Sequence, residues 1–219
     1  MIKHIIFDLD GTLINSIGGL AYSMNKVLEK YNLPQHTQTT YKSYIGNGMK
    51  KLVERSLPHN YDTYFTLDKA HKLMISNYEK FWQEDLFVYD DIFNLLRELK
   101  EKGFTYSILT NKKETFAKEI VDKLFTACGF QGVFGEVNNM FLKPNKEAIE
   151  RIVKTLKINT NECILVGDSE VDIKACQNAN ILSVACTWGF RDKIYLKSLS
   201  PKYLIDTPLE LIEILLNLK

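Results

Sequence analysis

The sequence carries no excess charge of one sign and few residues that interrupt regular structure. Its 219 residues include 28 Lys and Arg against 27 Asp and Glu, for a formal net charge of +1, with 5 Pro and 11 Gly. A chain without a net charge has no general attraction for nucleic acid, so we expect no nucleic-acid partner. The hydrophobic share of 45% and charged share of 25% are typical of a folded globular protein and exclude a disordered or collagen-like chain.

The sequence also lacks a long apolar run. The longest candidates, residues 163–166 and 181–186, are of strand length, far short of the ~18 residues that cross a bilayer. The apolar residues 5–7 are followed at once by Asp8 and Asp10, too soon for the core of a signal peptide. We therefore expect no membrane partner and a location in the cytoplasm.

Cysteine is scarce and shows no Cys-x-x-Cys pair. At least two of the cysteines lie within apolar runs, where free thiols pack as small hydrophobic groups. This pattern favours reduced core residues over a disulfide or a zinc site. The residues concerned are Cys128, Cys163, Cys176 and Cys186.

Strand and helix patterns alternate along most of the chain, which predicts an α/β fold with a Rossmann-like parallel sheet. Helices are expected over 91–102, after Pro144 at a first helical turn, from Val171, and through Leu211 and Leu215. A polar turn is expected at Thr110 and Asn111. Strands are expected at residues 2–7, 104–109, 163–166, 182–185 and 203–205.

A block of about seventy residues after the first strand has helical periodicity instead. Its apolar residues recur at helical spacing, for example Leu20, Met24 and Val27 in one stretch and Ala70 and Met74 in another. The organisation expected is an α/β core formed by 1–15 and 87–219, with a helical insert at 16–86.

Polar clusters follow several of the expected strands. In a parallel sheet, ligands collect beyond the carboxyl ends of the strands, so these clusters predict one site. Three carboxylates repel one another unless a cation offsets their charge, and hard oxygen ligands suggest magnesium. The clusters are Asp8 to Thr12, Thr110 with Asn111, Lys143 with Pro144, and Gly167 to Ser169 with Asp172.

The residue types in these clusters suit phosphoryl transfer. The carboxylate of Asp8 can attack a phosphoryl group to form an aspartyl-phosphate. Asp10 can protonate the leaving oxygen and then accept a proton from water. Lys143 and the Thr110 hydroxyl can hold the phosphoryl oxygens, where charge develops in the transition state.

Each cluster also has an ordinary structural explanation. The aspartate pair after the first strand fits a solvated turn beside a glycine. Thr110 and Asn111 cap helices well, and Lys143 fits a surface position before a proline. Ser169 and Asp172 have the spacing of a capping box. Capping and a role in the site are compatible.

Taken together, the motifs resemble those of haloacid dehalogenase superfamily phosphatases over nearly the whole chain. The pattern Asp-x-Asp-Gly-Thr stands at residues 8–12, the strand-end Ser/Thr at 110, the lysine at 143, and Gly-Asp-x-x-x-Asp at 167–172. The resemblance implies a nucleophile, Asp8, an acid/base, Asp10, and support from Asp172 and Ser169. It also implies magnesium held by Asp8, the backbone carbonyl of Asp10, and Asp168.

The helical insert resembles the cap of this superfamily, which excludes water and selects the substrate. Gly46, Gly48 and Lys50 in the insert, and Arg191 in the segment Thr-Trp-Gly-Phe-Arg, resemble the phosphoglycolate phosphatase branch and are expected to contact the phosphate or substrate together with Asn111. The sequence departs from the pattern at Asn15, where Asp is common.

The expected activity is magnesium-dependent hydrolysis of a small phosphorylated metabolite, first of all 2-phosphoglycolate to glycolate and phosphate, by a monomer or homodimer. Related branches keep other substrates open: pyrophosphate, nucleoside monophosphates and sugar phosphates. A phosphomutase, or an inactive protein that senses a phosphorylated ligand, are further alternatives from the same fold.

Overall fold

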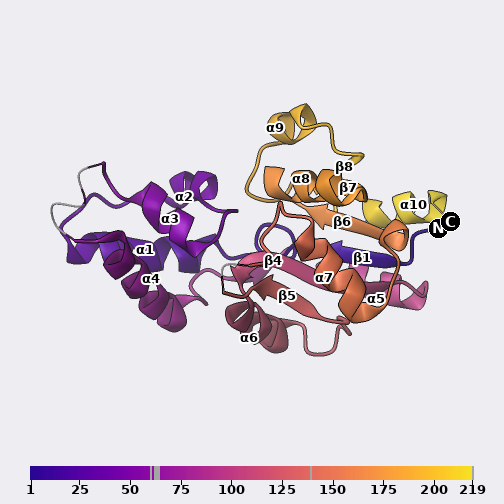
Figure 1. Cartoon of the computed structure of the whole chain (residues 1–219), viewed down its shortest axis with the longest axis horizontal. Helices are drawn as coiled ribbons and strands as arrows, with labels where there is room; N and C mark the ends of the chain where they lie inside the picture. Colours follow the sequence, from indigo (N-terminus) through magenta and orange to yellow (C-terminus); the bar gives the residue numbers. More distant parts are fainter. Residues whose placement is uncertain (60, 62–64, 139, 219) are drawn as a thin grey trace. The chain divides into compact units, whose positions relative to one another are not determined.

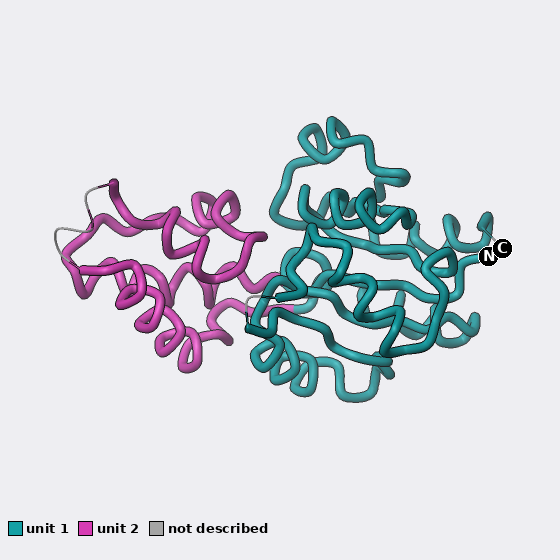
Figure 2. Tube along the Cα trace, in the orientation of Figure 1, with its two compact units in different colours: residues 1–14, 88–219 teal, residues 15–87 magenta. Residues whose placement is uncertain are grey.

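The computed structural model describes residues 1–59, 61, 65–138 and 140–218 (Figure 1). The chain divides into two compact units, one of residues 1–14 and 88–219 and the other of residues 15–87 (Figure 2). Two short strands, β2 (Ile14–Asn15) and β3 (Phe87–Val88), pair where the chain passes from one unit to the other. These boundaries lie one residue from those expected from the sequence.

The first unit is built on a six-stranded sheet in the order β5-β4-β1-β6-β7-β8, and every strand pairing in it is parallel. This confirms the α/β, Rossmann-like prediction. The chain builds outward from β1 to β4 and β5, then returns to β6 on the other side of β1. The strands are β1 (His4–Phe7), β4 (Thr105–Lys113), β5 (Val133–Glu136), β6 (Cys163–Gly167), β7 (Leu182–Cys186) and β8 (Tyr203–Ile205).

The two central strands are buried along their whole length and are apolar apart from His4, because helices cover the sheet on both faces. All four residues of β1 and all five of β6 are buried. Ile6 and Leu165 belong to a core cluster with residues of α7 (Glu147–Leu156) and α8 (Glu170–Ala179), which pack against each other. The other helices of this unit are α5 (Ile92–Glu101), α6 (Glu114–Leu124), α9 (Lys193–Ser198) and α10 (Glu210–Asn217), with a 3-10 turn, η2 (Thr160–Glu162).

The second unit consists of helices α1 (Ile17–Lys30), α2 (Gln38–Tyr44), α3 (Met49–Ser56) and α4 (Leu67–Phe81). Helices α1 and α4 pack along each other through their apolar stripes, which include the buried Met24 and Met74. Threonine side chains begin two of the helices, since Thr37 accepts from the Thr40 amide and Thr66 from the Lys69 amide. Among the described residues, no helix is both long and apolar enough to cross a bilayer.

Two local predictions are wrong. Thr110 and Asn111 do not form a turn, because β4 continues to Lys113, whose backbone position pairs with Glu136 of β5. Pro144 is not in a first helical turn, since it lies in a turn ahead of α7, which begins at Glu147. The first difference places Thr110 and Asn111 within the carboxyl-terminal part of β4.

Candidate active site

Two adjacent central strands carry the first two carboxylates of the site. Asp8 directly follows β1, and its amide donates to the Val166 carbonyl of β6 at 2.9 Å. Asp168 directly follows β6. The chain order reverses between β1 and β6, and such switch points are where open parallel sheets bind ligands.

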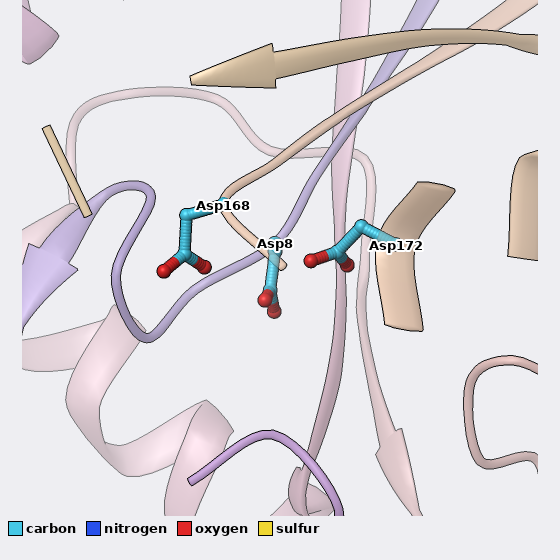
Figure 3. A group of neighbouring side chains, drawn as sticks. All are labelled: Asp8, Asp168 and Asp172. Carbon is cyan, nitrogen blue, oxygen red and sulfur yellow. The ribbon is translucent and has the colours of Figure 1, made fainter. Parts of the chain in front are cut away.

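Asp172 joins these two residues from the first turn of α8. One carboxylate oxygen from each of Asp8, Asp168 and Asp172 lies within 4.8 Å of the others, and all three residues are buried. Figure 3 shows the three side chains gathered from the loop after β1, the loop after β6 and α8, with Asp8 between the other two in this view. An all-oxygen donor set of this kind fits a hard divalent cation.

Asp172 forms the capping box that its spacing suggested and also contacts Lys143. Its Oδ2 atom accepts hydrogen bonds from the Ser169 amide at 3.1 Å and the Ser169 hydroxyl at 2.5 Å, which forms the capping box of α8. Its Oδ1 atom accepts from Lys143 Nζ at 2.6 Å. The same carboxylate thus begins a helix and orients a lysine.

Lys143 links two of the carboxylates, with Nζ 2.8 Å from Asp8 Oδ1 as well as 2.6 Å from Asp172 Oδ1. The lysine is only 3% exposed. The Asn111 side chain fixes its backbone, because Asn111 Nδ2 donates to the Lys143 carbonyl at 2.8 Å and the Lys143 backbone amide donates to Asn111 Oδ1 at 2.7 Å. Asn111 therefore positions Lys143 from β4.

Burial dominates the electrostatics of the cluster. It raises the pKa of Asp8 well above the usual range, against the opposing effect of Lys143. Burial, together with the charge of Asp172, raises the pKa of Asp168 to about 7. Burial lowers the pKa of Lys143, but Asp172 and Asp8 outweigh it and raise that pKa above its usual value. A bound cation would offset the negative charge that these carboxylates share.

Glycines let the backbone approach Asp168 closely. A Cβ atom on Gly11 would lie 2.4 Å from Asp168 Oδ2, and one on Gly189 would lie 2.3 Å from Asp168 Cβ. The Phe190 amide donates to Asp168 Oδ2 at 2.7 Å. The loop after β1 and the loop after β7 therefore hold this carboxylate in place from two sides.

Asp10 and Thr110 complete the polar groups at this edge of the sheet. Asp10 Oδ1 lies 3.0 Å from Lys112 Nζ. Thr110 is 2% exposed, and its hydroxyl oxygen accepts from the Lys112 amide at 3.2 Å. No sequence motif marks Lys112 as a site residue. Its position directly after Thr110 and Asn111 is the signal that was available.

The predicted substrate contacts outside the carboxylate cluster have partners of their own. Arg191 pairs with Glu170, with its Nε atom 2.9 Å from one carboxylate oxygen and its Nη2 atom 3.3 Å from the other. In the helical unit, Gly48 is the N-cap of α3 with φ 83°, Gly46 has φ 114°, and Lys50 Nζ lies 3.2 Å from Asp68. Contact of these residues with substrate stays a prediction.

Comparison with known proteins gives consistent matches. The model of the family described as haloacid dehalogenase-like hydrolase matches residues 5–186. The phosphoglycolate phosphatase of Colwellia psychrerythraea is 32% identical over 214 residues, covering 95% of this chain and 94% of that protein. The phosphoglycolate phosphatase of Vibrio parahaemolyticus is 29% identical and covers 97% and 96%.

Solved structures agree on the fold. A crystal structure described as a predicted phosphoglycolate phosphatase from Haemophilus somnus has a TM-score of 0.87 and 25% identity, and covers 97% of both chains. A haloacid dehalogenase-like hydrolase from Streptococcus pneumoniae has a TM-score of 0.86, 23% identity and 98% coverage of both. The predicted superfamily is confirmed by the family match over most of the sequence. The chain belongs to the haloacid dehalogenase-like hydrolases.

Proposed function

We propose that this protein is a magnesium-dependent phosphatase that hydrolyses a small phosphorylated metabolite through an aspartyl-phosphate. One observation carries the proposal: the buried Asp8 carboxylate lies in a cluster with Asp168 and Asp172, with Lys143 Nζ 2.8 Å from its Oδ1 atom. A carboxylate held between acidic groups and a fixed ammonium suits an attack on an anionic phosphoryl group once a cation reduces the repulsion.

The first half of the reaction transfers the phosphoryl group to Asp8. A carboxylate oxygen of Asp8 forms a bond to phosphorus, and the bond from phosphorus to the ester oxygen breaks. Asp10 gives its proton to the departing oxygen. Lys143 and the Thr110 hydroxyl, both buried at this edge of the sheet, hold the phosphoryl oxygens.

The second half returns Asp8 to its starting state. Water attacks phosphorus, Asp10 accepts a proton from that water, and the bond between phosphorus and the Asp8 oxygen breaks to release phosphate. Asp10 then carries the proton needed for the next leaving group. One acid/base residue thus serves both halves of the cycle.

The donor set also indicates which residues would hold magnesium. Both oxygens of Asp172 accept hydrogen bonds, from Lys143 and from Ser169, so we assign this residue to orientation of Lys143. Asp8, Asp168 and the backbone carbonyl of Asp10 would hold the ion. Bound there, it would reduce the repulsion between the nucleophile and the substrate phosphate.

We propose 2-phosphoglycolate as the substrate, supported by relatives at about 30% identity that carry the name phosphoglycolate phosphatase. We further propose that the helical unit, with Gly46, Gly48 and Lys50, acts as the cap that selects this substrate. Asn111 and Arg191 would contact the phosphate or the substrate. Asn111 also bonds the backbone of Lys143, and Arg191 is held by Glu170. Pyrophosphate, nucleoside monophosphates and hexose phosphates are the alternatives to test.

The experiment is phosphate release from these four classes of compound, with magnesium and with chelator, compared by kcat/KM. We expect chelator-sensitive release with 2-phosphoglycolate preferred. Asp8→Asn should reduce turnover by at least about a thousandfold, whereas Asp122→Asn, an exposed aspartate on α6, should leave it unchanged. Preference for another compound would reassign the substrate. Isomer exchange without phosphate release would indicate a mutase, and binding without turnover would indicate a sensor.

A further inference from the structure

A buried lysine that none of these steps uses lies beside the acid/base residue. Lys112 Nζ is 3.0 Å from Asp10 Oδ1, and the side chains are only 5% and 12% exposed. Lysine is almost never fully buried without a partner, because its ammonium loses hydration. The ion pair with Asp10 therefore accounts for the burial of the Lys112 ammonium at this edge of the sheet.

The backbone of Lys112 belongs to the central sheet. It lies within β4, its amide donates to the Thr110 hydroxyl oxygen at 3.2 Å, and the next residue pairs with Glu136 of β5. Asp10, by contrast, lies in the loop after β1, between β1 and β2. A strand residue thus anchors a loop residue, which is how a fixed frame orients a catalytic group.

We propose that Lys112 is a positioning residue that orients the Asp10 carboxyl group toward the oxygen of the leaving group. The inference rests on the proposed phosphatase function. Lys112 forms and breaks no covalent bond: Asp8 gains the phosphoryl group, the ester bond breaks, and the proton passes from Asp10 to the departing oxygen. Because proton transfer depends steeply on geometry, loss of the anchor slows this step.

The dependence on the leaving group separates this role from others. An alkoxide leaves only with a proton, whereas 4-nitrophenolate leaves readily without one. The value of kcat/KM reports the steps up to departure of the leaving group, so it is insensitive to the later attack of water. Misplacement of Asp10 should therefore lower kcat/KM for alkyl phosphates selectively.

The test compares Lys112→Met with Lys113→Met on an alkyl phosphate and on 4-nitrophenyl phosphate, with magnesium present. Lys113 is the neighbouring residue, is exposed, and lies over the Phe116 ring. We expect Lys112→Met to lower kcat/KM for the alkyl ester by about 10- to 100-fold and for the aryl ester by less than about threefold. Lys113→Met should change both by less than about twofold.

Two further variants keep the result decisive. Lys112→Gln retains a donor beside Asp10 and covers the case in which Lys112→Met does not fold. We expect it to lower kcat/KM for the alkyl ester more than for the aryl ester, as Lys112→Met does, but by a smaller factor. In an Asp10→Asn background, Lys112→Met should add no further loss with the alkyl ester, because the group it positions is gone. Thermal unfolding checks the fold of each variant.

Equal losses with both esters, or none with either, would overturn the positioning role while leaving the phosphatase intact. An additive loss in the Asp10→Asn background would also overturn it, because Lys112 would then act independently of Asp10. If the unaltered protein releases phosphate from neither ester nor any compound of the substrate panel, the proposed function itself fails. The two failures are therefore distinguishable.

Discussion

The buried polar groups at the two ends of strand β1 have opposite surroundings, charged at one end and neutral at the other. At the carboxyl end, Asp8 lies with other carboxylates and the buried ammonium of Lys143. At the amino end, His4 is 1% exposed and is surrounded by neutral partners, with its ring nitrogens 2.8 Å from the Thr105 and Ser107 hydroxyl oxygens. Only three residues, Ile5 to Phe7, lie between His4 and Asp8.

The difference shows that charged groups are buried at the carboxyl end of β1, where burial disfavours the charged form, and not at its amino end. Burial lowers the pKa of His4 to about 4, which favours a neutral ring whose hydrogen bonds are satisfied. Burial raises the pKa of Asp8 instead, and the cluster keeps several ionisable groups close together. Such crowding is typical of a site that binds an ion or a charged substrate, whereas a neutral, hydrogen-bonded side chain such as His4 is typical of a buried structural position.

Replacement of the central lysine should produce the largest effect. Lys143→Met leaves Asp8 and Asp172 buried without their shared cation, and we expect a loss of about 3–5 kcal/mol in the free energy of unfolding. Activity should fall by at least about a hundredfold, since a group that stabilises the phosphoryl oxygens is also lost. Urea unfolding and phosphate release measure the two effects.

The matched control is Lys146→Met, in the turn that leads into α7. Lys146 pairs with Glu150 at 3.1 Å, and both side chains are 55% exposed, so little change is expected. Similar stability for the two lysine variants would show that the charged cluster contributes no more than a surface pair. The contrast between the two ends of β1 would then lose its energetic basis.

A glycine substitution tests the packing around Asp168. Gly11 has φ 87°, and a Cβ atom there would lie 2.4 Å from Asp168 Oδ2. We expect Gly11→Ala to cost about 1–3 kcal/mol in the free energy of unfolding from backbone strain. Displacement of the carboxylate should also raise the magnesium concentration for half-maximal activity by at least about tenfold.

Gly103→Ala separates these two effects. Gly103 has φ 81°, but a Cβ atom there would meet nothing within 4 Å. This variant should show the strain cost without the change in magnesium dependence, as judged by titration of activity and by calorimetric titration with magnesium. If Gly11→Ala bound magnesium as tightly as Gly103→Ala, the close packing of Gly11 against Asp168 would not affect the affinity for magnesium.

The carboxylates at the carboxyl ends of β1 and β6 were more predictable from the sequence than the contacts that hold them in place. Asp8 and Asp168 follow short apolar runs, so a local pattern places them at strand ends. The anchoring of Asp10 by Lys112 depends on β4 continuing past Thr110, which follows from pairing with β5. That strand is short and remote in sequence, and no local pattern specifies the pairing.

The neutral histidine at the amino end gives the smallest expected effect, through the pH dependence of stability. The pKa of His4 is about 4 in the folded protein against its ordinary value of 6.5, so the unfolded chain binds more protons between these values. The contribution of His4 to the free energy of unfolding is therefore complete above pH 6.5 and is lost as the pH falls toward 4. The loss amounts to about 1.4 kcal/mol per pH unit at most.

Urea unfolding at pH 7 and pH 5 of the unaltered protein and of His4→Gln measures this contribution. The site carboxylates titrate in both proteins, so their effect cancels in the comparison. The unaltered protein should lose about 1–2 kcal/mol more than His4→Gln between the two pH values. Equal losses for the unaltered protein and His4→Gln would mean that His4 accepts a proton in the folded state, and that both ends of β1 tolerate buried charge.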